Sequence, residues 1–338
     1  MGPSLNALRW DGQPGHYEVY YLTVTDPESG VGVWIRYTMV APLVSAGEPA
    51  TASLWVLAMD PRPDQEPTFG RKATVPIDRL DSVAEPFELV IDGARLRDDG
   101  MSGAFEDVAW DLRWAPTDHG YEHVHPALQR LGVAKTVLVL PHADLAVDGT
   151  IMLGDERLEL RGARGGQAHL WGSKHASSWA WVHCNDFSHA DGTPARGAFV
   201  DGVSVLVPRL GRETGPNTPV VARVGERDFT STAPLRVVGN DSTFALTGWR
   251  FEAVDGDRKL IGEVDADRDQ LAGVTYHDPD GELAYCYNSE TASMRLHVFE
   301  RARQVGGWAH VTTLHAPGRA HVEYAQRTPL PEPPLLTT

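Results

Sequence analysis

Short runs of β-branched and aromatic residues recur along almost the whole chain, and turns rich in Gly, Pro and Asp separate them about every ten positions. Residues 16–24 and 31–42 flank the turn TDPESG in the pattern of a β-hairpin, and residues 51–59 continue as the next strand. Helical spacing occurs only at residues 126–134, where a proline suits the first turn and a glycine suits the end. The pattern predicts an all-β protein and disfavours a βαβ architecture.

The remaining predicted strands lie at residues 87–91, 109–114, 136–140, 149–153, 157–162, 202–208, 219–224, 235–239, 244–254, 259–264, 271–277, 282–288, 294–301 and 321–327. A chain of 338 residues is longer than a domain with a single hydrophobic core usually is. Two barrels of about eight to ten strands each account for this length. We expect the joint at residues 155–166, which are rich in charge and glycine, and therefore domains at 1–160 and 161–328. The Pro-rich residues 329–338 are predicted to form an unstructured tail.

The net charge of the chain limits the classes of partner that it is expected to bind. A formal net charge of −16 argues against nucleic acid, because a phosphate-binding surface needs a basic face. No run of roughly 18 apolar residues predicts a transmembrane helix, and the first residues lack the pattern of a signal peptide. We therefore expect a cytoplasmic protein, in which Cys184 and Cys286 are reduced, buried thiols.

Common catalytic motifs are missing from the sequence. It contains no G-x-S-x-G elbow, no phosphate-binding loop, no G-x-G-x-x-G turn and no C-x-x-C pair. His119, His123 and His125 lie within seven residues of one another, a spacing at which imidazoles can bind zinc or iron. No obvious fourth ligand accompanies them, and a polar loop explains them as well, so we assign no metal.

Residues 169–187 hold three of the ten tryptophans, three of the fourteen histidines and one of the two cysteines. Read as a strand, the stretch places Trp179, Trp181, His183 and Asn185 on one face and a largely apolar set on the other. Such a strand is covered on both sides. We expect the tryptophan face to line a barrel lumen and the smaller face to contact the neighbouring barrel.

A lumen lined by indoles suits an apolar ligand, which His183 and Asn185 would orient. The same pattern is also typical of a packed core in which one histidine bonds a backbone carbonyl.

Residues 162–187 resemble the signature stretch of the tocopherol cyclase family, which has a Gly-rich turn, a Trp-Gly pair and a Trp-x-Trp-x-x-x-Asn-x-Phe run. The matching residues are Gly165, Gly166, Trp171, Gly172, Trp179, Trp181, Asn185 and Phe187. Residues 103–116 and 15–30 resemble two further segments of the family more weakly.

This resemblance implies two lipocalin-like (calycin) barrels packed side by side, a fold shared with carotenoid hydratases of the hydroxyneurosporene type and with fungal cyclases that catalyse Diels–Alder closures. It also implies cofactor-free chemistry on a hydrophobic terpenoid, polyene or polyketide. The chain departs from the family at Ala168 and His169, where an acidic-basic pair is usual, and at His183, where Gln is usual. An acid of the relatives is thus absent, and we do not expect tocopherol as the product.

Cyclising or hydrating an alkene requires a proton donor and a surface, such as indole faces, that stabilises the resulting cation. His183 is the first candidate acid because it shares a face with the indoles, and His175 in the loop GSKHASS is the second. Asp186 and Asp111 are the carboxylate alternatives. The predicted ligand-binding residues are Trp171, Trp179, Trp181, Asn185, Glu18, Tyr20 and Trp110.

Structural explanations compete at these positions. His175 also fits an exposed loop histidine, Asp186 would face away from the indoles, and an inter-strand hydrogen bond would explain Asp111. The function expected from the sequence is a cyclase, hydratase or isomerase. The alternatives are a carrier of a hydrophobic small molecule and a β module that recruits another protein.

Overall fold

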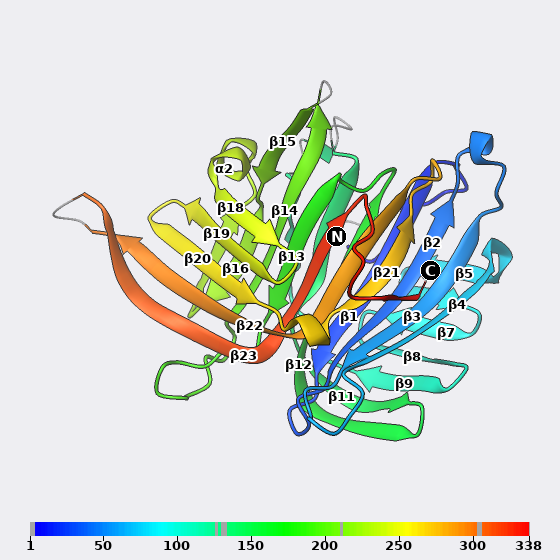
Figure 1. Ribbon diagram of the computed structural model, residues 1–338, viewed down its shortest axis with the longest axis horizontal. Helices are drawn as coiled ribbons and strands as arrows, with labels where there is room; N and C mark the ends of the chain where they lie inside the picture. The colour runs from blue at the N-terminus through cyan, green and yellow to red at the C-terminus, as the bar shows by residue number, and fades with distance from the viewer. Residues whose placement is uncertain (1–3, 126–127, 130–133, 210–211, 303–305, 338) are drawn as a thin grey trace.

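The computed structural model describes residues 4–125, 128–129, 134–209, 212–302 and 306–337. It confirms the all-β prediction, because two twelve-stranded sheets hold almost every element (Figure 1). The helix expected at residues 126–134 falls largely outside the described residues. Within the described ranges, no helix is long and apolar enough to span a membrane.

The first sheet has the strand order β4-β3-β2-β1-β12-β11-β9-β8-β7-β6-β5, and β10 pairs with β11. Its strands are β1 (His16–Thr25), β2 (Gly32–Ala41), β3 (Thr51–Met59), β4 (Thr68–Pro76), β5 (Leu80–Ala84), β6 (Phe87–Ile91), β7 (Ala94–Arg97), β8 (Gly100–Phe105), β9 (Val108–Arg113), β10 (Tyr121–Glu122), β11 (Thr136–Leu153) and β12 (Glu156–Gly172). The 3-10 turns η1 (Val44–Ala46) and η2 (Ile77–Arg79) follow β2 and β4.

The second sheet has the order β17-β16-β14-β13-β23-β22-β20-β19-β18, with β15 on β14 and with β21 between β22 and β24. Its strands are β13 (Ser178–Cys184), β14 (Phe199–Arg209), β15 (Arg212–Asn217), β16 (Val220–Val224), β17 (Arg227–Ser231), β18 (Asp241–Ala245), β19 (Gly248–Asp255), β20 (Arg258–Asp265), β21 (Ala272–His277), β22 (Leu283–Arg301), β23 (Trp308–Gln326) and β24 (Leu335–Thr337). The turn η3 (Arg268–Gln270) and the short helix α2 (Pro234–Gly239) complete it.

The opening hairpin forms where the sequence predicts it, between β1 and β2. Its strands are rich in aromatic and β-branched residues, which favour extended backbone. The side chain of Asp26 accepts hydrogen bonds from the backbone N and the hydroxyl of Ser29, and Gly30 supplies the positive φ of 78° that closes the turn.

Alternation along the strands divides the buried side chains into three cores. In β1, Tyr20 and Leu22 point into the interior of the first sheet, whereas Tyr17 and Tyr21 point toward the second sheet. One core therefore fills each curled sheet, and a third lies between the two sheets.

Strand β13 is buried on both faces, as its sequence predicts. The predicted direction of those faces is wrong. Trp179 and Trp181 belong to the core between the sheets, and the smaller Ala180 and Val182 face the interior of the second sheet. The reason is volume, since large side chains from other strands, such as Trp249, already occupy that interior.

Three other predictions need correction. Residues 235–239 form most of α2 instead of a strand, and Pro234 starts its first turn. Residues 329–337, the described part of the predicted tail, are not unstructured, because β24 pairs in parallel with β21 and the backbone N of Leu330 donates to the Tyr287 hydroxyl. Strand β12 continues through the expected joint, and the chain changes sheet between Gly172 and Ser178. The division into domains at residues 160 and 161 stays a prediction.

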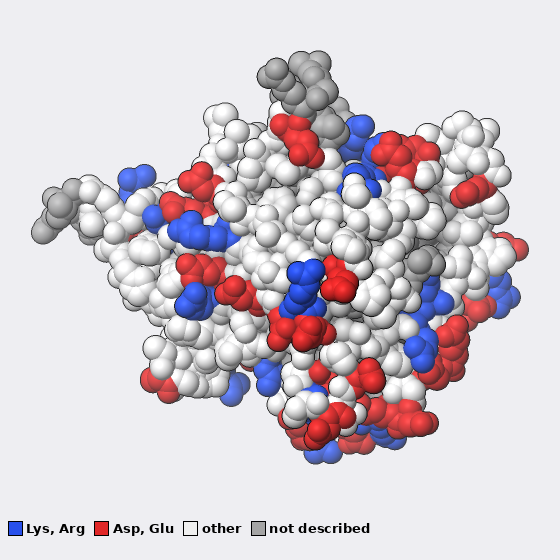
Figure 2. All heavy atoms as spheres, in the orientation of Figure 1, with Lys and Arg blue, Asp and Glu red and all other residues white. Residues whose placement is uncertain are grey.

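The surface and the thiols add two observations. Acidic and basic side chains are interspersed on the face seen in Figure 2, and acidic ones gather along its lower edge near β11 and β12. Cys184 and Cys286 are buried and unpaired with each other, which confirms the expected thiols.

Candidate functional site

A cavity of about 260 Å³ lies where the outer face of the first sheet meets β21 and the loop between β12 and β13. We call it the inter-sheet cavity. The first sheet contributes Tyr17, Arg36, Trp55 and Lys72 to its wall, and β21 contributes Tyr276. Further lining residues are His175 and His277, the hydroxyl residues Thr38, Thr51, Ser53, Thr74 and Thr275, and Val40, Pro42, Glu48 and Pro49.

His175 is the titratable group that the aromatic wall holds most tightly. Its ring stacks on Tyr17 with centroids 4.3 Å apart and an interplanar angle of 17°. It also stacks on Trp179 at 5.4 Å and on Tyr276 at 5.6 Å. The imidazole is thereby fixed in one plane at the edge of the cavity.

Asp278, which follows β21, orients that imidazole. Its Oδ1 atom lies 2.6 Å from His175 Nδ1 and accepts a 2.9 Å hydrogen bond from the His175 backbone N. Its Oδ2 atom accepts a 2.6 Å bond from Arg327 Nη1. With Nδ1 engaged by the carboxylate, Nε2 is the nitrogen left to act on a ligand.

The protonation states follow from burial and pairing. Burial lowers the pKa of His175, although the hydrogen bond to Asp278 opposes that shift. Burial alone would raise the pKa of Asp278, but hydrogen bonds from His175 and Arg327 outweigh it and the pKa is lowered. The pair near pH 7 is therefore a neutral imidazole on an ionised carboxylate, an arrangement that suits a general base.

Two cations share the wall with this pair. The Arg36 guanidinium lies 4.0 Å from the centroid of Tyr276 and its Nε donates to Thr38 Oγ1 at 2.8 Å. The Lys72 ammonium lies 4.2 Å from the centroid of Trp55, and burial, with the charge of Arg36, lowers its pKa. The cavity is thus aromatic and positively charged.

His183, the first sequence candidate, forms a second imidazole–carboxylate pair between the sheets. Its Nδ1 lies 3.1 Å from Asp201 Oδ2. Asp201 Oδ1 lies 2.9 Å from His123 Nε2 and accepts a 3.2 Å bond from Trp181 Nε1. Burial would raise the pKa of Asp201, but hydrogen bonds from the two histidines lower it.

His183 is tightly packed and does not line the inter-sheet cavity. Its Nε2 is buried and has no hydrogen-bond partner among the described residues. A Cβ placed on Gly166 of β12 would lie 2.4 Å from that atom, so the imidazole rests directly on the glycine backbone. A proton donor needs contact with its substrate, and the burial of this nitrogen against Gly166 argues against that role.

His321 and Glu290 continue the buried row beside His183. His321 Nδ1 lies 2.7 Å from Glu290 Oε2, and both side chains are 1% exposed. Burial raises the pKa of Glu290 to about 8 and, with the charge of His183, lowers that of His321 to about 3. The two groups therefore hold a single proton over a wide pH range.

The other predicted catalytic and signature residues lie away from the inter-sheet cavity. Asp111 is exposed on β9, and Asp186 is half-exposed, 3.8 Å from Arg319. Asn185 Nδ2 donates to the carbonyl of Gly165 at 2.7 Å, which is a structural bond across the sheets.

Glu18, Tyr20 and Trp110 lie inside the first sheet. Glu18 is fully buried and bonded to His16, His169, the Tyr20 hydroxyl and the backbone N of Arg9 and of Trp10. Burial works against its ionisation, but bonds from the two histidines lower its pKa to about 2. Trp110 Nε1 donates to the Tyr37 hydroxyl, and Trp171 is half-buried under Arg9. Of the predicted residues, only His175 lines the cavity, and Trp179 stacks on His175 without lining it.

The residues that the sequence analysis missed are Tyr17, Arg36, Trp55, Tyr276 and Asp278. Arg36 carried a usable signal, because it is a lone charge in the apolar run VWIRYTMV of β2. Asp278 carried none, since 103 positions separate it from His175.

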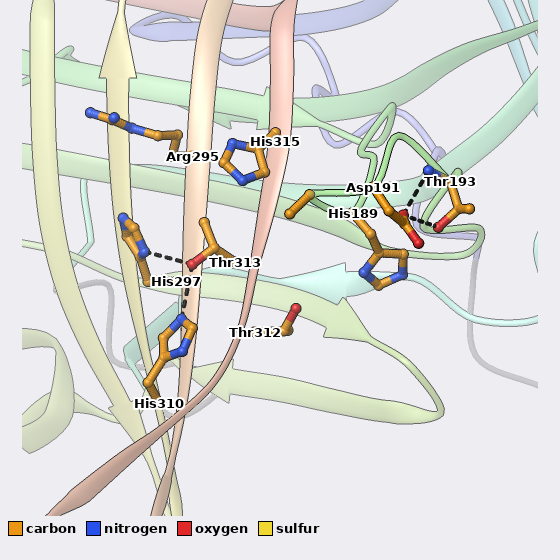
Figure 3. Close-up of a pocket in the computed structure, with 10 residues that line it drawn as sticks. His189, Asp191, Thr193, Arg295, His297, His310, Thr312, Thr313 and His315 are labelled. Atoms are coloured by element: carbon orange, nitrogen blue, oxygen red, sulfur yellow. Dashed lines mark hydrogen bonds between the residues drawn. The ribbon is translucent and has the colours of Figure 1, made fainter.

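A wider depression of about 840 Å³ lies on the outer face of β22 and β23 (Figure 3). His297 and His310 converge on the Thr313 hydroxyl at 3.0 Å and 2.9 Å, and His189 lies across the depression. Exposed polar side chains such as Arg295 form most of this open surface. The inter-sheet cavity, which is more enclosed and aromatic, is the better candidate for a ligand site.

The three clustered histidines of the sequence do not form a metal site in the described ranges. His119 lies at the surface, with its Nε2 3.0 Å from the Tyr121 hydroxyl. His123 is buried against Asp201, and His125 is exposed.

Some known proteins are similar to this chain in sequence or in structure. No family model matches the chain. An uncharacterised protein of Mycobacterium tuberculosis, MT0513 in strain CDC 1551 and Rv0493c in strain H37Rv, is 28% identical over 306 residues, which cover 89% of this chain and 87% of the relative.

Three solved structures share the fold. A Nitrosomonas europaea protein provisionally described as AttH aligns with a TM-score of 0.56 at 12% identity and covers 97% of this chain and 100% of its own. Kievitone hydratase from Nectria haematococca aligns at 0.54 and 9%, covering 96% and 93%, and CghA with Sch210972 at 0.56 and 10%, covering 92% and 88%. The chain therefore has a lipocalin-like fold of two antiparallel barrels.

Proposed function

We propose that this protein is a cofactor-free enzyme of the hydratase, cyclase or isomerase type that moves a proton on a small hydrophobic molecule in the inter-sheet cavity. The observation that carries the proposal is His175, which Asp278 orients and aromatic rings clamp at the cavity wall. Hydration, cyclisation and isomerisation all need a proton delivered to or taken from a carbon atom, and a positioned imidazole supplies that transfer.

The roles follow from the geometry. His175 Nε2 takes a proton from the ligand and later returns it, and Asp278 stabilises the imidazolium formed in between. Tyr17, Trp55 and Tyr276 make much of the cavity lining aromatic, and this apolar lining suits contact with a terpenoid, polyene or polyketide skeleton. His175 thus takes the role that the sequence assigns first to His183.

Two solved structures support the reaction class by analogy. One is named a hydratase, and CghA was solved with the small molecule Sch210972. A shared fold alone does not fix a reaction, so the argument depends on the residues of this cavity. The buried, unpaired thiols are compatible with the cytoplasmic location, which stays a prediction.

The test starts from small molecules retained by the full-length protein. They are identified by mass spectrometry, returned to the protein, and followed for an isomer or for gain or loss of water. His175→Ala should lower turnover roughly 10²–10⁴-fold and leave the retained amount nearly unchanged. His189→Ala, an exposed histidine of the other depression, is the matched control and should behave as the parent.

Full turnover in His175→Ala would contradict the proposal. Retention of a molecule by the parent protein without any conversion would favour the carrier instead.

A further inference from the structure

Arg36 is a buried positive charge that has no direct carboxylate partner among the described residues. Its residue is 4% exposed, and within the described part of the chain its guanidinium forms no ion pair. Among the described residues, its hydrogen-bond partner is the Thr38 hydroxyl. Burying a cation without a counter-charge is costly, so its retention at a cavity wall points to an external partner.

The other charged groups around the cavity do not neutralise Arg36. Lys72 adds a second cation on β4, and Glu48 is exposed in the loop after η1. Glu323 of β23 lies behind the wall, where Trp179 and Tyr276 donate to it at 3.3 Å and 3.4 Å. Burial raises the pKa of Glu323, and the charge of Arg36 opposes this shift without overcoming it, so Glu323 is a weak counter-ion for Arg36.

The aromatic faces at this site are already engaged by the protein's own groups. Tyr276 faces Arg36 at 4.0 Å, and Trp55 faces Lys72 at 4.2 Å. Tyr17 is stacked on His175. A carbocation formed here would therefore meet like charges and occupied ring faces, which opposes the cationic mechanism expected from the sequence.

Two residues of the cavity wall also have side-chain atoms without a hydrogen-bond partner in the described chain. Trp55 Nε1 and Thr275 Oγ1 are buried and lack a partner among the residues that the structure describes. Both residues line the cavity. With Arg36, they leave the wall richer in donors than its own acceptors can satisfy.

We infer that the ligand of the inter-sheet cavity carries an oxygen that is negatively charged, either in a carboxylate or in the enolate that forms from a carbonyl group. Arg36 binds this oxygen. The inference rests on the proposed function and names its substrate class: an organic acid or an enolisable carbonyl compound with a flat apolar body.

The corresponding chemistry balances without a co-reactant. His175 Nε2 takes a proton from the carbon beside the carbonyl, the C–H electron pair forms a C=C bond, and the carbonyl π pair moves to the oxygen held by Arg36. Where a C=C bond adjoins the carbon that lost the proton, the oxygen pair re-forms C=O, the C=C bond shifts by one position, and the proton returns at the far carbon to give an isomer. Expulsion of a β-hydroxyl with that proton gives water and an alkene, and the reverse is a hydration.

Two matched probes test the inference on the full-length protein by calorimetry. 2-Naphthoate carries a negatively charged carboxylate. 2-Naphthamide has the same ring and nearly the same shape, but its carboxamide is neutral. We expect the parent protein to bind 2-naphthoate roughly tenfold or more tightly than 2-naphthamide. Arg36→Gln should abolish that preference, Arg36→Lys should keep part of it, and Arg295→Gln in the other depression should leave it intact.

Equal or tighter binding of 2-naphthamide by the parent protein would overturn the inference, and this comparison needs no variant to fold. A preference that persists in folded Arg36→Gln would overturn it as well. Failure of both probes to bind would contradict both the role of the cavity as a ligand site and the proposed function. An Arg36-dependent preference alongside full turnover in His175→Ala would instead uphold the inference and defeat the proposed catalytic role.

Discussion

Two imidazole–carboxylate pairs lie between the same two sheets, and they differ in what surrounds them. His183 and Asp201 are enclosed by Trp181, His123 and the backbone of Gly166. His175 and Asp278 stand at the wall of a cavity of about 260 Å³. The chemical pair is the same in both places, so the open volume beside the ring, and not the pair itself, separates a structural tie from a candidate catalyst.

The two carboxylates should therefore differ in their effect on stability. Asp201→Ala leaves His183 and Trp181 without this buried acceptor and leaves His123 only the carbonyl of residue 201 at 3.4 Å, and should lower the free energy of unfolding by about 4 kcal/mol. Asp278→Ala should cost about 2 kcal/mol, because water in the cavity can replace part of the lost bonds. Urea titration of both variants measures the order, and a larger loss in Asp278→Ala would break the comparison.

Gly166→Ala tests whether the enclosed pair is sealed by contact. The added Cβ would lie 2.4 Å from His183 Nε2, so the variant should lose about 2 kcal/mol of unfolding free energy through overpacking. Gly248→Ala is the matched control in a strand, since its Cβ would meet only Val264 O at 3.7 Å. If Gly166→Ala is as stable as the control, a space exists beside His183 that the structure does not show.

The proton shared by Glu290 and His321 should make stability depend on pH. Between pH 6.5 and 8 the folded pair keeps one proton that the unfolded groups, with ordinary values of 4.5 and 6.5, have lost. The free energy of unfolding should therefore fall as pH rises through this window, by up to about 1.4 kcal/mol per pH unit. Below pH 4.5 the unfolded chain binds the extra proton first, so stability should fall again toward pH 3.

Glu290→Gln removes the carboxyl that holds the proton at high pH. Its unfolding free energy should no longer decline between pH 6.5 and 8, whereas the decline toward pH 3, which His321 causes, should remain. Parallel urea titrations of parent and variant across pH provide the measurement. Identical slopes above pH 6.5 would show that the pair does not hold this proton.

The smallest effect is expected at the surface of the loop that carries His175. Lys174 pairs with Asp280 at 2.6 Å and with Glu282 at 2.9 Å, but all three side chains are partly exposed to solvent. Lys174→Met should change the free energy of unfolding by less than about 1 kcal/mol, because such pairs are weak. A larger loss would mean that this ion pair, and not Asp278, fixes the loop.

The sequence predicts the class of fold well because the evidence for it is local. The run of aromatic and β-branched residues in β1 and the turn at Asp26 depend on neighbouring residues, and both occur where expected. The direction of β13 could not be predicted in the same way. It depends on the volume that Trp249 and other side chains from distant strands occupy inside the second barrel.

The candidate site likewise contains some residues that local sequence could indicate and others that it could not. His175 could be selected from the sequence because it lies next to the tryptophan run, but its partner Asp278 reaches it only after β21 has paired with β22. Arg36 could have been found as a charge within an apolar strand. Its aromatic neighbours come from three separate strands, which the sequence does not bring together.

The contact between Gly166 and His183 has a consequence for comparing relatives. A homologue with any side chain at the first position must accommodate it with a smaller residue at the second, so the two sites should mutate together through evolution. Persistence of that glycine in a lineage would then record a steric constraint at the junction of the barrels, and its presence alone would not be evidence of shared catalysis.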